Sequence, residues 1–242
     1  LTRTLARELG VRLDIVAVGT DESVTSSLAA VQNEAAVADV NCEITIRHGN
    51  DPAAEIRTAA LAANTQLLVI GRRLYPGATE VGPVAQRILA AAPCAVLVVA
   101  PGSQLWSRRV LVAFDGSDAA RSATELAAQL AKPRLLPITL FSITDSSGQL
   151  PPEIEDAAQL SIAELKLDGL TGDLSGGNGN IAEGILKAAR DTGADLIVLY
   201  RHTRGGLSRK LLGSVGDEVI RGAEVPVLLV GETAQTGLDA AG

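Results

Sequence analysis

The residues with the clearest chemical potential lie between Leu196 and Ser214, where the chain reads LIVLYRHTRGGLSRKLLGS. An uninterrupted apolar run leads into a loop with glycines and arginines, and the loop ends at Gly213-Ser214, where a helix is expected to begin. Many α/β proteins bind phosphate with this order of parts, because backbone N–H groups of the loop and of the helix N-terminus point at one anion. The stretch therefore indicates an anion site, to which basic side chains add positive charge.

A second candidate group, Asp115-Gly116-Ser117, follows the apolar strand Arg109–Phe114. In open α/β sheets, ligands bind beyond the carboxyl ends of the strands, at the point where the strand order reverses. An acidic side chain there can accept a hydrogen bond from a ribose hydroxyl or a base amine, and glycine lets backbone amides come close to a phosphate. Asp115 taken alone is at least as typical of a turn or a helix cap.

These groups must be positioned by a structural unit that occurs twice in the chain. The segment Ala53–Arg73 matches Ile181–Arg201 as an acidic helix start, an Ala-rich helix, a short turn and an apolar strand. Arg87–Pro101 matches Val219–Glu232 as a helix, a short loop and a final strand. Both offsets are about 130 residues, which indicates a tandem repeat. The alternation of strands and helices predicts right-handed crossovers and parallel strands with helices on both faces.

The expected elements follow from hydrophobic periodicity and from turn residues. In the first half we expect helices over Leu1–Leu9, Glu22–Ala38, Asp51–Asn64 and Pro83–Ala91, and strands over Val11–Val18, Cys42–Arg47, Leu67–Ile70 and Ala95–Val99. The second half opens with the strand Arg109–Phe114, which has no counterpart in the first half. It continues with helices over Ala119–Ala131, Pro152–Leu167, Ile181–Thr192 and Gly213–Arg221, strands over Leu136–Ile143, Leu196–Tyr200 and Val225–Val230, and one weak strand within the Gly-rich segment Asp168–Asn180.

We expect two domains, over residues 1–100 and 109–232, joined by a linker over 101–108 and followed by a tail over 233–242. The single tryptophan, Trp106, lies in this linker, and we expect it to pack the linker onto a domain. The chain has no methionine and begins at Leu1 inside an expected helix, which is consistent with a longer gene product.

Three motifs together resemble the universal stress protein family: VAFDGS at a strand end, AEGILKAARDTGADLIVL, and GGLSRKLLGSVGDEVIRGAEVPVLLV. The resemblance covers Arg109–Val230 in the second half and Leu1–Val99 in the first. It implies an α/β fold of two tandem, doubly wound, parallel five-stranded sheets, adenine nucleotide alpha hydrolase-like, the first without its opening strand. Members of the family commonly dimerise through their last strands. The resemblance therefore implies an internal pseudo-dimer in which Ala95–Val99 pairs with Val225–Val230, and leaves a homodimer of two chains open.

Family members that bind ATP typically carry the motif G-x2-G-x9-G-[S/T] after the fourth strand. In the second half, Gly213-Ser214 closes the motif, but Tyr200 and Thr203 stand where its first two glycines should be. Side chains at these positions crowd the backbone approach on which phosphate binding depends. In the first half, Gly71 is kept, Leu74 replaces the second glycine, and Pro83, which lacks an N–H, replaces the Ser or Thr. We therefore expect the first half to bind no nucleotide.

For the second half, two interpretations stay open: a modified, weakened ATP site, or a pocket blocked by Tyr200 and Thr203. Arg201, Arg204, Arg209 and Lys210 make the loop locally basic, either as solvated side chains or through phosphate contacts from Arg204 and Arg209. The candidate ATP-binding residues are Asp115, Gly116, Ser117, Arg204, Gly205, Gly206, Arg209, Gly213 and Ser214.

The sequence contains no motif of a catalytic nucleophile, a zinc site or a P-loop, and neither histidine, His48 or His202, has an evident catalytic partner. We expect no catalytic residues and no metal. The resulting hypothesis is a non-catalytic regulatory module of the stress response with an uncertain ATP site. An interaction scaffold that binds no nucleotide is the alternative, and a slow ATP hydrolase is a weaker one.

Composition restricts the class of partner. The net charge of −7 and the pI near 4.9 argue against a general nucleic-acid binder, because binding to phosphate backbones needs a basic face. No apolar run approaches the roughly 18 residues of a membrane span, so we expect a cytoplasmic protein without a membrane partner. Cys42 and Cys94 lack metal or redox spacing, which favours reduced thiols in or beside buried strands.

Overall fold

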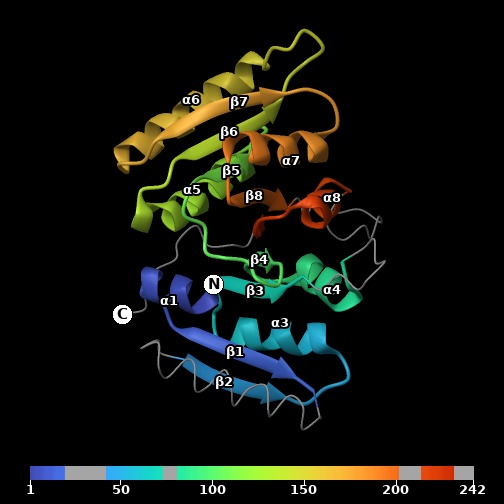
Figure 1. Ribbon diagram of the computed structural model, residues 1–242. Helices are drawn as coiled ribbons and strands as arrows, with labels where there is room; N and C mark the ends of the chain where they lie inside the picture. The colour runs from blue at the N-terminus through green and yellow to red at the C-terminus, as the bar shows by residue number, and fades with distance from the viewer. Residues whose placement is uncertain (20–41, 73–80, 202–213, 232–242) are drawn as a thin grey trace.

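Parallel strands flanked by helices make up both halves of the chain, and the computed structural model describes residues 1–19, 42–72, 81–201 and 214–231 (Figure 1). The first half contains α1 (Thr2–Leu9), β1 (Leu13–Val18), β2 (Cys42–Arg47), α3 (Pro52–Ala62), β3 (Leu67–Gly71), α4 (Pro83–Ala91) and β4 (Ala95–Val99). The second half contains β5 (Val110–Ala113), α5 (Asp118–Ala131), a 3-10 turn (Lys132–Arg134), β6 (Ile138–Ile143), α6 (Pro152–Leu167), β7 (Gly172–Gly177), α7 (Ile181–Thr192), β8 (Leu196–Arg201), α8 (Ser214–Gly222) and β9 (Val227–Gly231).

Each described α-helix and strand overlaps an element expected from the sequence, and the predicted α/β class is confirmed. The expected helix Glu22–Ala38 lies outside the described residues. Local signals account for the agreement at helix ends. Asp51 caps α3 by accepting a hydrogen bond from the Ala54 N–H, and Gly193 ends α7 in the left-handed region with a φ of 69°.

Seven strands form one sheet in the order β3-β4-β9-β8-β5-β6-β7, and β1 pairs with β2 in a separate parallel sheet. Pairing is parallel within each half, whereas β4 and β9 run antiparallel, with Val96, Leu97 and Val98 opposite Leu229, Leu228 and Val227. The predicted pairing of the two last strands is confirmed. Because the halves meet antiparallel, the carboxyl ends of their strands lie at opposite edges of the shared sheet.

Side chains alternate between two apolar layers along the buried strands. In β8, Leu196 and Val198 pack in the cluster that contains α5 and α6, whereas Ile197 and Leu199 pack in the cluster that contains α7 and α8. Leu5 of α1 joins the first cluster and Ala53 of α3 joins the second. Helices therefore cover both faces of the strands, as the doubly wound arrangement requires.

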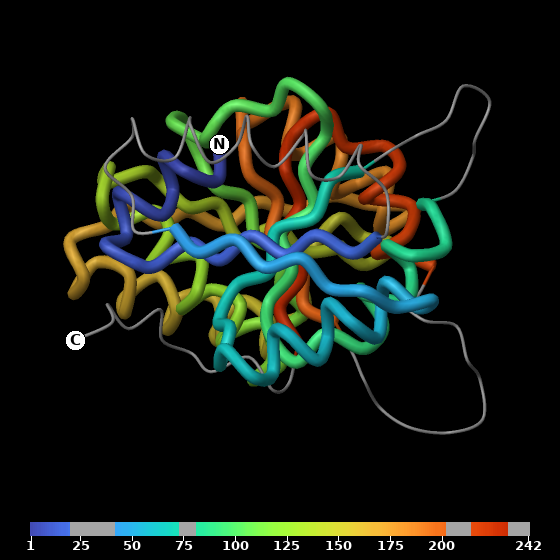
Figure 2. Tube along the Cα trace, turned by 90° about the horizontal axis from the view of Figure 1, so that it is seen from below, coloured from blue at the N-terminus to red at the C-terminus, as the bar shows by residue number. Residues whose placement is uncertain are grey.

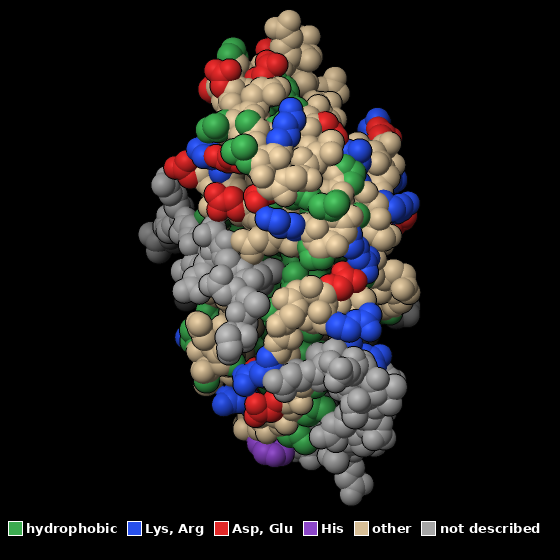
Figure 3. Space-filling model, turned by 90° about the vertical axis from the view of Figure 1, so that its left-hand side faces the viewer, with side chains coloured by type: hydrophobic (Ala, Val, Ile, Leu, Met, Phe, Trp, Pro, Cys, Tyr) green, Lys and Arg blue, Asp and Glu red, His purple; other side chains and the backbone are tan. Residues whose placement is uncertain are grey.

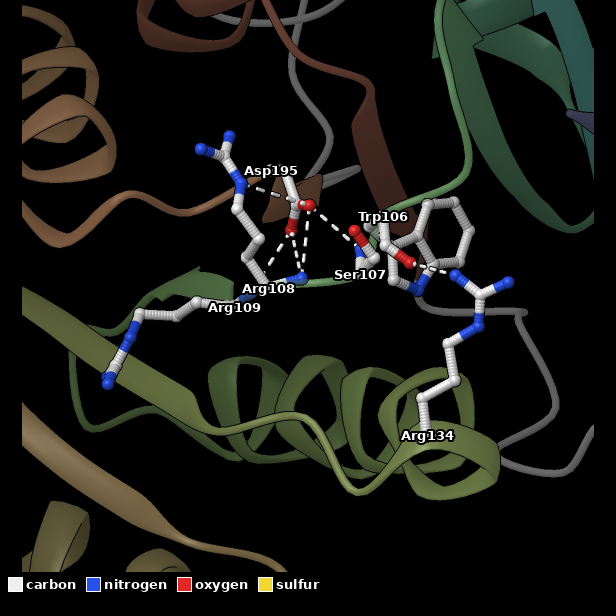
Figure 4. Close-up of polar contacts among 6 residues, drawn as sticks. All are labelled: Trp106, Ser107, Arg108, Arg109, Arg134 and Asp195. Carbon is white, nitrogen blue, oxygen red and sulfur yellow. Dashed lines mark hydrogen bonds and ion pairs between the residues drawn. The ribbon is translucent and has the colours of Figure 1, made fainter.

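The linker before β5 is anchored to the second half (Figure 4). The Asp195 carboxylate accepts hydrogen bonds from the backbone N–H groups of Ser107 at 2.8 Å and of Arg108 and Arg109 at 3.1 Å. Trp106 is 2% exposed, and its indole N–H donates to the Leu130 carbonyl at 3.3 Å. The expected packing of Trp106 is confirmed.

Within the described part of the chain, no helix is both long enough and apolar enough to cross a membrane.

Candidate functional site

The carboxyl ends of β5 and β8 form the point where the strand order of the second half reverses. β5 pairs with β6 on one side and with β8 on the other, so the chain leaves β5 toward β6 and leaves β8 in the opposite direction toward β9. Asp115 follows β5 at this edge, and Arg201 ends β8 beside it in the strand order. The two segments singled out in the sequence thus start from neighbouring strands at the type of edge where α/β proteins bind ligands.

Asp115-Gly116-Ser117 forms a hydrogen-bonded turn that leads into α5. The Asp115 Oδ1 accepts from the Ser117 N–H at 3.0 Å and from its hydroxyl at 2.5 Å, and the Ser117 Oγ accepts from the Ala120 N–H at 3.2 Å. Gly116 has a φ of 79°, and a Cβ there would lie 3.4 Å from the Ile154 Cα. The positive φ is the reason that glycine suits this position, since the added Cβ would make only an ordinary van der Waals contact.

This geometry makes Ser117 a helix cap and Asp115 a turn residue. Asp115 is nevertheless exposed, so its turn contacts do not bury it. Asp118 adds a second acidic side chain in the first turn of α5. Two carboxylates at this helix start repel a phosphate, whereas a ribose hydroxyl or a base amine can donate to Asp115.

The other candidate residues divide between described and undescribed parts of the chain. Ser214 is exposed and is the first residue of α8. Tyr200 is half-buried and packs against the same apolar cluster as α5. The remaining candidates lie outside the described residues: Thr203, Arg204, Gly205, Gly206, Arg209, Lys210 and Gly213, together with His202.

The structure corrects the expectation that Arg201 is a solvated basic side chain at the start of the loop. Arg201 is only 4% exposed, and its guanidinium donates to the Leu89 carbonyl and, at 3.0 Å, to the Ala92 carbonyl. Both acceptors lie at the end of α4 in the first half, where helix carbonyls lack intrahelical donors. Gly231 leaves room for this side chain, since a Cβ there would lie 2.5 Å from the Arg201 Nη2.

Arg72, at the end of β3, makes the reciprocal contact. Its Nη1 donates to the Ile220 carbonyl and, at 3.2 Å, to the Arg221 carbonyl at the end of α8 in the second half. Burial lowers the pKa of both Arg72 and Arg201, but neither side chain loses its charge at physiological pH. Sequence reasoning missed this pair, although the repeat places both arginines directly after matching strands.

At the corresponding strand and helix ends, the residues of the first half differ from those of the second. Gly71 ends β3, Gly82 precedes α4, and Pro83 is the first residue of that helix. The N-terminus of α4 therefore offers one N–H fewer than a serine or threonine would give. Leu74 lies outside the described residues, and His48 is exposed directly after β2.

Three further observations concern surface charge, metal-ligating side chains and the two thiols. On the face shown in Figure 3, acidic and basic side chains are interspersed rather than gathered into one basic patch. No group of three or more metal-ligating side chains that could hold an ion occurs in the residues that the structure covers. Cys42 and Cys94 are free thiols, Cys94 buried and Cys42 half-buried, and burial raises the pKa of Cys94 to about 11.

Comparisons with known proteins agree with the repeat. The profile of the Universal stress protein family matches residues 5–100 and again residues 107–231. The "Universal stress protein in QAH/OAS sulfhydrylase 3'region" of Thermus aquaticus is 34% identical over 134 residues, which cover 51% of this chain and 98% of that protein.

Two solved structures share the whole arrangement. A universal stress protein from Archaeoglobus fulgidus superposes with a TM-score of 0.76 at 21% identity, covering 95% of this chain and 93% of that one. A putative universal stress protein from Pseudomonas aeruginosa superposes with a TM-score of 0.76 at 18% identity, covering 95% of this chain and 86% of that one. At these identities the likeness extends to the fold.

Proposed function

Since this chain belongs to the universal stress protein family, as two copies of the family's unit in tandem, we propose that it is a non-catalytic regulatory module that binds an adenine nucleotide in its second half. The observation that carries the proposal is the position of Asp115. It is exposed at the carboxyl end of β5, beside β8, where the strand order reverses. An acidic acceptor at this point suits a ribose hydroxyl or a base amine.

In the proposed site, Asp115, Gly116 and Ser117 face the nucleoside part of the ligand. Arg204, Gly205, Gly206 and Arg209 contact the phosphates together with the helix start at Gly213-Ser214. We assign these roles from charge, because Asp115 and Asp118 make the start of α5 acidic, whereas the loop after β8 carries the arginines. Arg201 takes no part, because it is buried against α4.

A regulatory rather than a catalytic role is supported by the partners of Asp115. Its Oδ1 accepts hydrogen bonds from Ser117, which is itself committed to capping α5. A general base would have to lie within reach of a proton at the reacting phosphates, whereas we assign Asp115 to the nucleoside part of the ligand. We therefore propose that ATP acts here as a ligand whose binding is sensed.

Binding of ATP with Mg²⁺ to the 242-residue protein tests this proposal. At 100 times the dissociation constant, ATP should stabilise the fold by about 2.7 kcal/mol, measured as a shift in thermal unfolding. Asp115→Asn keeps one acceptor oxygen for the Ser117 turn and replaces the other by an amide group that cannot accept from a ribose hydroxyl or a base amine, so it should weaken ATP binding without unfolding the protein. Asp156→Asn, an exposed change on α6, is the matched control. Absence of any shift at millimolar ATP contradicts the proposal.

The second candidate function is an interaction scaffold that binds no nucleotide. Tyr200 favours it, because this half-buried side chain occupies the position of the first motif glycine. Under this alternative, ATP leaves the native protein unchanged, and Tyr200→Gly together with Thr203→Gly creates ATP binding. If the native protein binds ATP and the double variant binds it no more tightly, the alternative is excluded.

A further inference from the structure

Two described elements border the proposed phosphate-binding loop in the sequence, and each is bound to the first half. β8 ends at Arg201, directly before residues 202–213, which lie outside the described part of the chain, and α8 begins at Ser214, directly after them. Arg201 binds the end of α4, whereas the end of α8 is bound by Arg72 of the first half. The first half thus holds both elements from which this loop starts and ends.

α8 connects the Arg72 contact to the proposed site. The helix has nine residues, which gives a length of about 13 Å, with Ser214 at one end and the Ile220 and Arg221 carbonyls near the other. Val219 and Ile220 are fully buried, but apolar packing has no direction and does not fix how far a helix slides along its axis. Hydrogen bonds are directional, so those from Arg72 fix where α8 ends and hence where it begins.

The Arg201 contact fixes the end of β8 in a comparable way. No carboxylate among the described residues pairs with this buried guanidinium, and its Nε makes no hydrogen bond to them. The Leu89 and Ala92 carbonyls compensate its charge, because the carboxyl end of a helix carries partial negative charge. Losing them would leave a buried charge without a partner, which is costly. Arg201 can therefore leave α4 only if the end of β8 moves with it.

Movement at Arg201 reaches the proposed site through the neighbouring residue. Tyr200 stands at the place of the first motif glycine, and its side chain packs against the apolar layer of α5, on the other face of the strand. Because side chains alternate along a strand, holding Arg201 toward α4 also holds Tyr200 on the α5 side. Arg201 is thus a positioning residue, which acts on the site through Tyr200 rather than by touching the ligand.

The two acceptor helices share one apolar layer. Ile88 and Leu89 of α4 pack in the same cluster as Val219 and Ile220 of α8. Figures 1 and 2 both show α4 and α8 on the right-hand side of the molecule. Close-packed layers transmit displacements, so a shift of either helix reaches the other through packed side chains as well as through the arginines.

We propose that the first half sets the ATP affinity of the second half through Arg72 and Arg201, and that bound ATP in turn tightens the contacts of both arginines. This inference rests on the ATP site proposed above. Coupling of this kind is reciprocal: if the arginine contacts raise ATP affinity by some factor, ATP strengthens those contacts by the same factor. The first half, which has Pro83 at the start of α4, then registers the ATP occupancy of the second.

Titration calorimetry with ATP and Mg²⁺, at a temperature where circular dichroism shows each protein fully folded, tests the first part of the proposal. Arg72→Met should weaken ATP binding about tenfold, although Arg72 lies at the other end of α8 from Ser214. Arg72→Lys keeps a donor for the helix carbonyls and should recover most of the affinity. Arg87→Met is the matched control, because the exposed ion pair of Arg87 with Asp51 stays within the first half. It should bind ATP as the native protein does.

Amide hydrogen exchange of the native protein tests the reciprocal part without any substitution, so the result is decisive even if Arg72→Met does not fold. Saturating ATP should slow exchange over residues 88–92 at the end of α4. The reference is β2, which lies in the first half but takes part in neither arginine contact. In Arg201→Met, which lacks the donor to α4, the effect at α4 should disappear.

The outcomes separate this inference from the proposed function. Slower exchange at α4 together with weaker ATP binding by Arg72→Met supports the inference. Three results overturn it and leave the ATP site standing: native affinity in Arg72→Met, an equal loss of affinity in Arg87→Met, or unchanged exchange at the end of α4. If the native protein binds no ATP, the proposed site and the inference are both wrong.

Discussion

The cross-half arginine contact brings a buried thiol and a buried guanidinium together. Burial raises the pKa of Cys94 to about 11, and the nearby Arg201 acts in the opposite direction because it attracts the thiolate. Desolvation is the larger effect. The sequence identified Cys94 as a core thiol from its place beside an apolar strand, but it gave no indication of Arg201 as a neighbour, since the two are brought together by the pairing of β4 with β9.

Burial of Cys94 should make the free energy of unfolding fall at alkaline pH. The unfolded thiol titrates near its ordinary pKa of about 9, whereas the folded thiol keeps its proton to about 11, so the unfolded state loses its proton first. Below pH 9 both states keep the proton, so this contribution to stability is fully present. As pH rises from about 9 to 11, the free energy of unfolding should fall by about 2–3 kcal/mol. Urea unfolding of the native protein and of Cys94→Ala at pH 7, 9 and 10.5 measures this. Parallel pH profiles for the two proteins would contradict the expected role of burial.

Single side chains also hold a helix start and the linker in place, and only the first of these could be predicted from the sequence. The cap of α5 was predictable, because Asp-Gly-Ser before an Ala-rich helix is a familiar start signal. Asp195 was not singled out. It looks like a turn residue in the sequence, yet its carboxylate binds three linker N–H groups from residues almost ninety positions earlier in the chain.

Removing the cap should weaken α5 in a measurable way. Ser117→Ala loses the acceptor for the Ala120 N–H and should lower the free energy of unfolding by about 1 kcal/mol. Ser117→Asp supplies a carboxylate acceptor at the same place and should recover most of that loss. Chemical denaturation measures both variants, and Ser122→Ala, within the helix, is the control. Equal stability of Ser117→Ala and Ser117→Asp would mean that the cap contributes nothing.

Loss of Asp195 should have a larger effect, because three linker N–H groups and the Arg108 side chain share its carboxylate. Asp195→Ala should lower the free energy of unfolding by about 2–3 kcal/mol, as expected for hydrogen bonds to a charged group. Asp195→Asn keeps one acceptor oxygen and should lose less. Trp106 fluorescence, which reports on the linker itself, follows the transition. An unchanged unfolding midpoint for Asp195→Ala would exclude the anchoring role.

At the scale of the whole molecule, the repeat predicted most of the architecture. The offset between matching helices and strands gave two α/β units, and the resemblance of the last strands to a dimer interface gave the β4–β9 pairing that the structure shows. Periodicity within one segment cannot show how Arg72 and Arg201 cross to the other half, because such contacts depend on the path of the whole sheet. The ligand loop over residues 202–213 stays a prediction.

The two arginines should hold the halves together as one cooperative unit. Arg72 binds the end of α8 and Arg201 the end of α4, at opposite edges of the sheet, so each caps a helix of the other half. Methionine has similar length but donates no hydrogen bond, so each single Arg→Met change leaves helix carbonyls unpaired and should lower stability by about 1–3 kcal/mol.

In the double variant Arg72→Met/Arg201→Met, the two halves should no longer unfold together. Trp106 fluorescence, which reports on the second half, and circular dichroism, which reports on total helix, should then give transitions with different midpoints. Arg121→Met, which removes only an exposed ion pair with Glu164 inside the second half, is the control and should change little. If both probes still give one coincident transition at the native midpoint in the double variant, the β4–β9 pairing and its apolar layers alone unite the halves. The reciprocal arginines would then be a consequence of the repeat rather than a cause of its cooperativity.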